Sequence, residues 1–511
     1  MSTASAWSVA LNGIEGAMVE VEVAEGGGLP RTVLVGLPDA ALSQAKERVR
    51  AAVTGAELPW PNGLVTINLS PANLPKTGTH YDLAIATAAL AAIDKVPKEA
   101  ARNHVCLGEL GLDGRVRRVP GILPALLAAV RSGFDKAIVP ASQEAEASLV
   151  PGVTVWAIGH LKDLVAVLNG EPPLGGWEPP GDEDVASRQR PPLDFREVRG
   201  HLEGRWVMEV AAAGRHHVFL HGAPGVGKTM LASRLTSILP PLDGEEAVEV
   251  SALHSLAGMD LSGGLLIDPP YADPHHSSSP ASIIGGGMRL VRPGSISLAH
   301  RGVLFLDEAP EFGTRVLDAL RTPLESGWIS IGRAAIQVRY PARFQLVLAA
   351  NPCPCGFHGV TGRECRCSPM VVRRYQERLS GPIMDRIDIR HHMLPQSRSF
   401  LGDSLEQPES SAEIATRVLM ARERQARRLQ STPWRTNGEV AGPWLRSHLP
   451  LPEDLSPLEK ALNRGLLSAR GVDKVLRLAW TVADLAGEDR ISAASLRVAM
   501  QLRQGMFHEA A

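Results

Sequence analysis

The chain has 511 residues, of which 44% are hydrophobic and 21% are charged, and its net charge is -2. At about 100–200 residues per domain it is long enough for several buried cores, and its composition excludes global disorder and a uniformly basic nucleic-acid coat. No apolar run approaches the ~20 residues of a membrane span. The first ten residues lack the basic and apolar regions of a secretory signal, so we expect a cytoplasmic protein that does not associate with membranes.

Residues 1–168 predict a mixed α/β domain. Alternating apolar and polar residues predict strands at residues 17–25, 31–37 and 64–69. Asp39 is placed to cap a helix that follows it, and the Ala-rich residues 81–93 predict a buried helix. Residues 169–192 are rich in proline and glycine, which indicates a linker.

Residues 193–392 change to short apolar strands that alternate with helices and long loops. The strands are continuously apolar, as in a parallel sheet covered on both faces, and lie at residues 218–220, 303–306 and 344–349. A polar stretch at 393–412 predicts a second linker, and helical patterns dominate the last region, 413–511. We therefore expect an α/β protein with three domains, the last of them helical.

A phosphate-binding motif follows the first of these strands. Residues 222–229 read GAPGVGKT, which matches the pattern GxxxxGK[ST] between an apolar strand and a helix. Glycines let backbone N–H groups curl around phosphate oxygens, and the following helix N-terminus adds partial positive charge. Lys228 is suited to contact the β- and γ-phosphates of ATP, and the Thr229 hydroxyl to ligate Mg²⁺. The predicted nucleotide-binding residues are Gly222, Ala223, Pro224, Gly225, Val226, Gly227, Lys228 and Thr229.

Two further polar sites follow apolar strands downstream. Asp307 and Glu308 end the strand at 303–306, where Asp307 is predicted to bind Mg²⁺ and Glu308 to orient or deprotonate the attacking water. Asn351 ends the next strand and is predicted to reach the γ-phosphate or the water. These assignments rest on the phosphate-binding motif, because acidic residues end many buried strands.

Four of the five cysteines lie within residues 353–367, as two CxC pairs separated by nine residues. The thiolates of Cys353, Cys355, Cys365 and Cys367 are enough to close a tetrahedral Zn²⁺ shell. The alternative is a loop of reduced thiols. We favour a structural metal, because cysteines that cluster in a reducing compartment more often bind metal than form disulfides.

Longer stretches carry a resemblance to one family. They read PHHSSS at 274–279, GGG at 285–287, RPGSISLAHRGVLFLDE at 292–308, NPCPCG at 351–356 and RLSGPIMDRID at 378–388. Together with the order of motifs, they resemble the magnesium-chelatase-like AAA+ ATPases of the YifB/ComM family over nearly the whole chain. The resemblance implies a parallel-sheet ATPase core with a C-terminal helical lid, assembled into a ring that is a hexamer in relatives.

The same resemblance implies roles for residues outside the nucleotide motifs. Arg386 matches the family's arginine finger, which acts on the neighbouring subunit's nucleotide, and Arg470 matches the sensor-2 arginine of the lid, with Arg477 as the alternative. Two elements line the central pore of hexameric relatives, an insert and a hairpin. The segment around PHHSSS resembles the insert, and residues 328–341 resemble the hairpin. A surface salt bridge is the alternative role for either arginine.

The N-terminal domain, residues 1–168, resembles the ribosomal-S5-like domain of Lon protease and RadA, through residues 68–86. His80 falls where the catalytic serine of Lon-type proteases would lie, so we interpret this domain as non-proteolytic.

Residues 331–398 hold 11 arginines, no lysine and 4 acidic residues. A basic stretch near a pore suits a nucleic-acid backbone, although the same arginines could serve ATP, subunit contacts and salt bridges. The resemblance to ComM, a branch-migrating DNA helicase, favours a DNA-remodelling motor. A metal-insertion ATPase like magnesium chelatase and a protein-remodelling chaperone are the alternatives.

Overall fold

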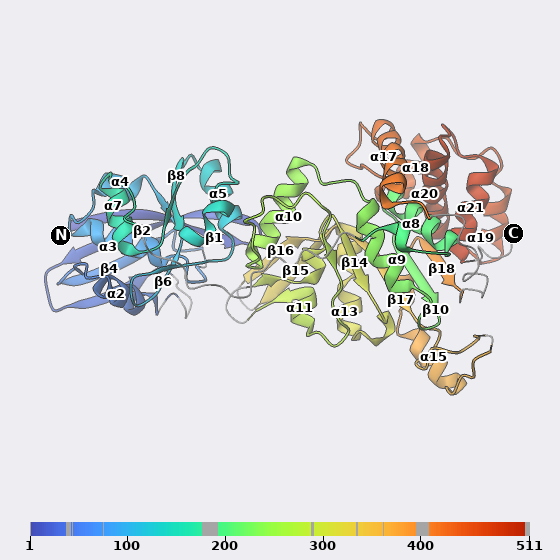
Figure 1. The fold of residues 1–511 in the computed structure, drawn as a ribbon, viewed down its shortest axis with the longest axis horizontal. Coiled ribbons are helices and arrows are strands. Elements are labelled where there is room, and N and C mark those ends of the chain that lie inside the picture. Colours follow the sequence, from blue (N-terminus) through green and yellow to red (C-terminus); the bar gives the residue numbers. More distant parts are fainter. Residues whose placement is uncertain are drawn as a thin grey trace.

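The computed structural model describes residues 2–36, 42, 44–74, 76–175, 193–287, 291–333, 336–360, 362–394 and 408–505. The molecule is elongated, with an N-terminal α/β unit at one end, a parallel-sheet unit in the middle and a group of helices at the other end (Figure 1). Among the described residues, no helix is both long and apolar enough to cross a membrane.

The N-terminal unit is built on a seven-stranded mixed sheet in the order β3-β4-β2-β1-β5-β8-β9. Its strands are β1 (Ser2–Asn12), β2 (Glu15–Gly26), β3 (Arg31–Val35), β4 (Leu64–Ser70), β5 (Val105–Cys106), β8 (Lys136–Pro140) and β9 (Thr154–Ile158), and a separate hairpin joins β6 (Glu109–Leu110) and β7 (Val116–Arg117). Its helices are α2 (Ala45–Gly55), α3 (Asp82–Ala92), α4 (Lys98–Arg102), α5 (Ile122–Arg131), α6 (Glu144–Ala147) and α7 (Leu161–Leu168). The three predicted strands correspond to β2, β3 and β4, while β1 was not predicted.

The predicted buried helix is α3, in which every residue is buried. Its alanines let it lie close against β1 and β2, which explains why a helix of small residues sits inside the unit. The helix predicted after Asp39 is α2, which begins at Ala45 with Gln44 at its N-cap. Asp39 itself lies outside the described residues.

A five-stranded parallel sheet in the order β11-β14-β17-β10-β18 forms the middle unit. The strands are β10 (Val218–Gly222), β11 (Tyr271–Ala272), β14 (Val303–Leu306), β17 (Gln345–Ala350) and β18 (Ile389–Met393). The three predicted apolar strands are thus confirmed as parallel neighbours. Because all five strands run the same way, the segments that follow β10, β14 and β17 meet at one edge of the sheet.

Helices and hairpins surround this sheet. The helices are α8 (Leu202–Gly214), α9 (Lys228–Arg234), α10 (Gly244–Leu256), α11 (Pro280–Ile284), α12 (Ser295–Leu298), α13 (Thr314–Ala319), α14 (Arg321–Ser326), α15 (Pro369–Glu377) and α16 (Gly381–Met384). The hairpins pair β12 (Gly285–Gly286) with β13 (Arg292–Pro293), and β15 (Trp328–Arg333) with β16 (Ile336–Pro341). The second is the hairpin expected at residues 328–341.

The N-terminal unit contacts this hairpin directly. Gly13, in the turn between β1 and β2, has a φ of +68°, and a Cβ there would lie 2.5 Å from the carbonyl oxygen of Arg339. Leu11 and Ile14, on either side of the turn, pack against the apolar cluster that contains Val338 and Tyr340. The turn therefore supports the hairpin from the N-terminal side.

The C-terminal region is helical, as expected, and consists of α17 (Ser411–Arg428), α18 (Gly442–His448), α19 (Ser456–Asn463), α20 (Ala469–Ala486) and α21 (Ala493–Gln504). Helix α17 begins at a capping box, in which Ser410 and Glu413 each bind the other's backbone N–H. The buried face of α20, including Trp480, shares one apolar cluster with β10, so the helical region and the sheet form a continuous core. The predicted linkers, 169–192 and 393–412, lie mostly outside the described residues, which omit 176–192 and 395–407.

Candidate functional site

The phosphate-binding loop connects β10 to α9. Gly225 and Gly227 both have positive φ, at +80° and +86°, a backbone conformation that L side chains rarely adopt. Around Gly225 no described atom lies within 4 Å of an ideal Cβ position, so the loop backbone is open to a ligand. The local sequence thus produces a loop of the kind that exposes N–H groups to phosphate oxygens.

Lys228 is the first residue of α9, its ammonium reaches back to the start of the loop, and it is only 8% exposed. Its Nζ donates to the carbonyl oxygens of Gly222 at 2.7 Å and Ala223 at 2.9 Å, and to Oδ1 of Asn351 at 3.0 Å. Burial lowers the pKa of Lys228 from its usual 10.5, while Asp307 and Glu308 act to raise it. The structure therefore brings together Lys228 and Asn351, which are 123 positions apart in the chain.

A second pair of predicted residues meets beside the loop. The hydroxyl of Thr229 donates to Oδ2 of Asp307 at 2.7 Å, and the other carboxylate oxygen of Asp307 accepts from the backbone N–H of Glu308 at 2.9 Å. Hydroxyl and carboxylate oxygens are the ligands that Mg²⁺ prefers, and here one of each lies next to the phosphate-binding loop. The residues present therefore fit a Mg²⁺ ion bound together with nucleotide phosphates.

Glu308 stands at the start of the turn after β14, with a φ of +49° that is uncommon for a residue other than glycine. Its side chain is 49% exposed, and one carboxylate oxygen lies 3.3 Å from Nδ1 of His276. His276 belongs to the PHHSSS segment, which the family resemblance assigned to an insert lining a pore. Sequence reasoning missed this contact, because no local pattern relates His276 to Glu308.

Arg386 and Arg470 lie at the opposite edge of the sheet. Arg386 precedes β18, whereas Lys228 follows β10, and these strands are parallel neighbours. At about 3.3 Å per residue, the five residues of β18 separate the two edges by roughly 15 Å. Neither arginine can therefore contact a phosphate group held by Lys228 of the same chain.

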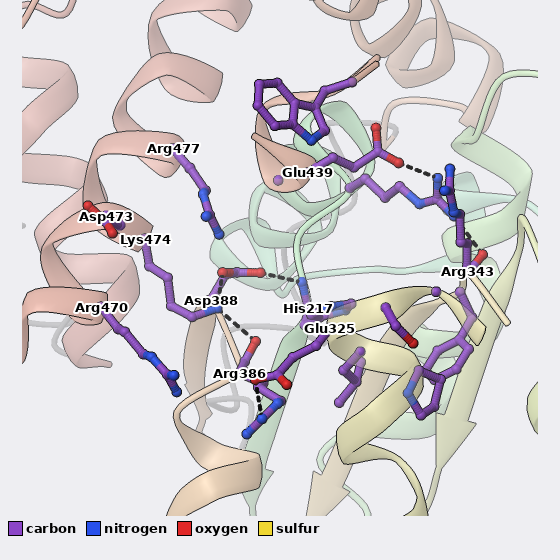
Figure 2. Close-up of a pocket in the computed structure, with 18 of the residues that line it drawn as sticks. His217, Glu325, Arg343, Arg386, Asp388, Glu439, Arg470, Asp473, Lys474 and Arg477 are labelled. Carbon is purple, nitrogen blue, oxygen red and sulfur yellow. Dashed lines mark hydrogen bonds and ion pairs between the residues drawn. The ribbon is translucent and has the colours of Figure 1, made fainter. Parts of the chain in front are cut away.

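The two arginines line one cavity of about 590 Å³, and so does Arg477, the alternative sensor-2 residue. Figure 2 shows Arg470, Lys474 and Arg477 extending from α20 toward Arg386 and Asp388. Arg386 donates to a carboxylate oxygen of Glu325 and to the carbonyl oxygen of Pro382, and Arg470 forms an ion pair with Asp385 at 3.4 Å. The structure thus groups both predicted arginines with each other and not with the phosphate-binding loop.

Lys474 joins the helical region to the segment that carries Arg386. Its buried ammonium donates to the carbonyl oxygen of Arg386 at 2.8 Å and to Oδ1 of Asp388 at 2.6 Å. Burial by itself would raise the pKa of Asp388, but the charge of Lys474 and a hydrogen bond with His216 outweigh it and hold that pKa well below its usual value. The buried ion pair fixes the backbone of Arg386 relative to α20.

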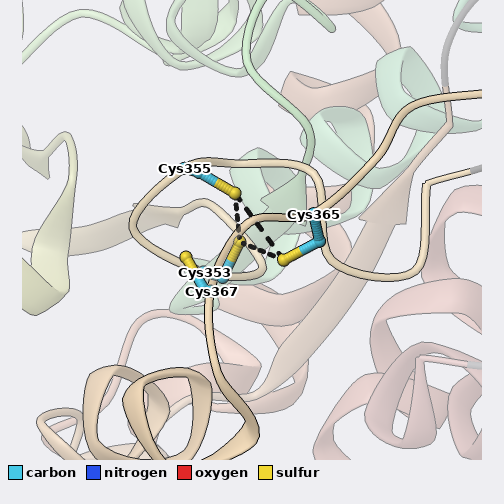
Figure 3. Close-up of side chains that lie close together, drawn as sticks. All are labelled: Cys353, Cys355, Cys365 and Cys367. Atoms are coloured by element: carbon cyan, nitrogen blue, oxygen red, sulfur yellow. Dashed lines mark hydrogen bonds between the residues drawn. The ribbon is translucent and has the colours of Figure 1, made fainter.

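The four clustered cysteines come together in one loop (Figure 3). The Sγ–Sγ distances are 3.3 Å for Cys353–Cys355, 3.7 Å for Cys353–Cys365 and 3.6 Å for Cys355–Cys365, and all four sulfurs lie within 4.8 Å of one another. A disulfide needs about 2.05 Å, whereas a tetrahedron with Zn–S bonds of about 2.3 Å places its sulfurs about 3.8 Å apart. The arrangement therefore matches a tetrahedral thiolate site.

Backbone N–H groups point at these sulfurs. The N–H of His358 donates to Sγ of Cys353 at 3.4 Å, and the N–H groups of Phe357 and Arg366 lower the pKa of the Cys355 thiol to about 6, which favours the thiolate that binds metal. Burial and the neighbouring sulfurs raise the pKa of Cys365 and of Cys367, so these two thiols gain most from a cation that replaces their protons.

The basic stretch at 331–398 does not form one patch. Arg343 and Arg386 line the cavity described above, while Arg373 and Arg378 form ion pairs with Glu377 and Glu311. On the hairpin, the Arg339 guanidinium lies over the ring of Trp328, at 5.3 Å from its centroid. Arg339, which is exposed on β16, is thus an arginine of this stretch that lies on the hairpin expected to line a pore.

In the N-terminal unit, His80 is buried and one of its ring nitrogens lies 2.8 Å from the carbonyl oxygen of Val9. The nearby Lys76 ammonium donates to the carbonyl oxygen of Pro71. Both contacts hold the backbone of the unit together. That the domain is non-proteolytic, because His80 falls at the position of the catalytic serine, stays a prediction.

Three family descriptions match successive parts of the chain. Residues 19–143 match "Subunit ChlI of Mg-chelatase", residues 194–400 match "Magnesium chelatase, subunit ChlI", and residues 408–503 match "Magnesium chelatase, subunit ChlI C-terminal". The chain is similar over 182 residues to the magnesium-chelatase 38 kDa subunit of Rhodobacter capsulatus, at 26% identity, covering 32% of this chain and 52% of that one.

Other relatives match from end to end. The chain is 48% identical over 509 residues to an uncharacterised protein of Mycobacterium tuberculosis, with 99% of each chain covered. It is 40% identical over 508 residues to the competence protein ComM of Haemophilus influenzae, with 98% of each covered, and 40% identical over 492 residues to YifB of Escherichia coli, covering 96% of this chain and 95% of that one. With this full-length identity and this fold, the chain belongs to the YifB/ComM family of magnesium-chelatase-like AAA+ ATPases.

Proposed function

We propose that the protein hydrolyses ATP at sites shared between neighbouring subunits of a ring. The observation that carries this proposal is the separation of Lys228 and Arg386 at opposite edges of one parallel sheet. One copy holds the nucleotide, and a second copy, related by rotation, presents Arg386 and Arg470 to its phosphates. A head-to-tail contact of this kind closes into a ring, and a hexamer fits the family.

Within each site the roles follow from chemistry. The loop N–H groups and Lys228 bind the β- and γ-phosphates, Thr229 and Asp307 hold Mg²⁺, and Glu308 orients the attacking water. Mg²⁺ neutralises charge on the phosphate oxygens when it is bound. Asn351 contacts the γ-phosphate or the water in this proposal, which its hydrogen bond from Lys228 supports.

We further propose that the motor acts on DNA. The likeness to a competence protein and the exposed Arg339 of the β15–β16 hairpin support this proposal. Phosphate contacts release counterions, so binding should weaken steeply with salt and vary little with base sequence.

The hairpin arginines provide a test of the DNA proposal. We expect Arg333→Ala combined with Arg339→Ala to reduce DNA binding and DNA-stimulated ATP hydrolysis several-fold, because each lost phosphate contact lowers affinity, while basal hydrolysis stays unchanged. Arg102→Ala combined with Arg427→Ala, at exposed positions on α4 and α17, is the matched control. The measurement is DNA binding at several salt concentrations, with hydrolysis rates on single-stranded, duplex and four-way-junction DNA.

A ring-forming ATPase whose rate no DNA form changes at low salt contradicts the DNA proposal. That result would favour a protein-remodelling or a metal-insertion motor, which share the same ATPase core.

We also propose that the cysteine cluster binds one structural Zn²⁺. Metal analysis of untagged protein should give close to one equivalent per chain, and Cys365→Ser with Cys367→Ser should abolish it, because two thiolates cannot close the tetrahedral shell. Wild-type protein with four titratable thiols and no metal would contradict this assignment.

A further inference from the structure

The cysteine loop touches the phosphate-binding loop. Gly356 follows Cys355 directly and has a φ of +84°, and a Cβ added there would lie 2.4 Å from Cγ and 2.5 Å from Cδ of Pro224. Pro224 is part of the GAPGVGKT motif. Only a glycine lets the backbone of the cysteine loop approach the proline ring so closely.

The two loops are connected at a second point. Asn351, which accepts a hydrogen bond from Lys228, lies two residues before Cys353. Just after it, the carbonyl oxygen of Pro352 accepts from Nε2 of Gln376 on α15, which follows the last cysteine. The cysteine loop therefore begins next to Asn351, which contacts Lys228, and contacts the phosphate-binding loop again where Gly356 lies against Pro224.

The shape of this loop depends on the four sulfurs. A bound divalent cation would offset two of the four thiolate charges and close the chain between Cys353 and Cys367, a constraint that irregular backbone cannot supply by itself. Without a cation, no bond joins the four sulfurs, and the loop can open. Opening would withdraw Gly356 from Pro224 and loosen the residues around Asn351.

We propose that the metal bound by the four cysteines holds the phosphate-binding loop in its nucleotide-binding shape, so that Zn²⁺ and ATP each increase the affinity of the protein for the other. This inference rests on the proposed zinc and nucleotide sites. Coupling between binding sites is reciprocal, so it can be measured from either ligand.

Two glycines of the loop give a matched pair of variants. Gly356→Ala places a methyl group against Pro224, whereas Gly359→Ala, at a φ of +74°, has no described atom within 4 Å of its Cβ position. Both variants carry the same cost of a left-handed alanine, so their difference reports the contact with Pro224. We expect both to keep one Zn²⁺, and Gly356→Ala alone to lose about tenfold in affinity for a fluorescent ADP analogue, a size typical of coupled sites.

The reverse direction is measured on wild-type protein. In equilibrium competition with the chromophoric chelator 4-(2-pyridylazo)resorcinol, the affinity for Zn²⁺ should be several-fold higher with Mg²⁺ and ADP present, a change within the range of coupled sites. Lys228→Ala should remove this increase, because it prevents nucleotide binding while leaving the cysteines unchanged.

The possible outcomes distinguish a failure of the coupling from a failure of the proposed zinc site or of the proposed function. Equal nucleotide affinity of Gly356→Ala and Gly359→Ala, with Zn²⁺ affinity unaffected by nucleotide, overturns the coupling alone. Wild-type protein without bound metal overturns the zinc site, and wild-type protein that does not bind nucleotide overturns the proposed function.

Discussion

Glu308→Gln is expected to bind ATP with nearly the wild-type affinity and to lose turnover by about 10²-fold or more, as removal of a general base does. Glutamine keeps the size of the side chain but cannot accept a proton from water or orient it as a carboxylate does. Glu308 makes no contact with Lys228, and its carboxylate lies beside His276. Binding is measured with a fluorescent nucleotide and turnover by phosphate release.

Lys228→Ala is the comparison for this variant, because its ammonium lies inside the phosphate-binding loop. Removing it should abolish measurable nucleotide binding and with it hydrolysis. Glu311→Gln is the control: it changes a carboxylate that lies three residues after Glu308 and pairs with Arg378. This variant should leave nucleotide binding and hydrolysis unchanged. Hydrolysis by Glu308→Gln at the wild-type rate would show that another group activates the water.

The strands and loops that carry the nucleotide motifs were predictable because each has a strong local signal. Val303–Leu306 is apolar throughout and buried, and it ends in two carboxylates, a pattern typical of a central parallel strand. The strand β1 was missed because its buried positions are filled by small residues such as Ala4, Ala6 and Ser8, which give little apolar contrast. The edge strand β18 was missed because Arg390, His391 and His392 interrupt it.

Contacts between distant parts of the chain could not be predicted from local patterns. The family resemblance named Arg386 and Arg470, but their meeting in one cavity depends on how α20 packs against the start of β18. Likewise, the contact between Gly356 and Pro224 depends on a long irregular loop. Sequence therefore predicted the strands and loops that carry the candidate residues better than it predicted which of those residues lie together.

Arg386→Ala is expected to bind ATP normally and to lose about 10³-fold or more in turnover, the range measured for arginine fingers. Binding survives because the phosphate-binding loop of the same chain lies at the far edge of the sheet. Turnover is lost because the Arg386 guanidinium no longer faces the charge that develops on the γ-phosphate of the neighbouring site, and Arg470 alone does not replace it. Arg373→Ala, which removes an exposed arginine paired with Glu377 on α15, is the control and should change neither quantity.

A mixture of two inactive variants distinguishes a shared site from a damaged one. In a ring of Arg386→Ala and Lys228→Ala subunits, some interfaces pair an intact Lys228 of one subunit with an intact Arg386 of the next. About a quarter of the interfaces do so when equal amounts mix at random around a head-to-tail ring. Hydrolysis should therefore reappear on mixing, whereas each variant alone stays inactive. Restored activity cannot come from a site built within one chain, because every chain in the mixture lacks one of the two residues. No recovery in mixed rings, or a protein that remains monomeric with ATP and Mg²⁺ and still hydrolyses at full rate, would mean that Arg386 serves its own chain through Glu325 and the Pro382 carbonyl and not a neighbour's nucleotide.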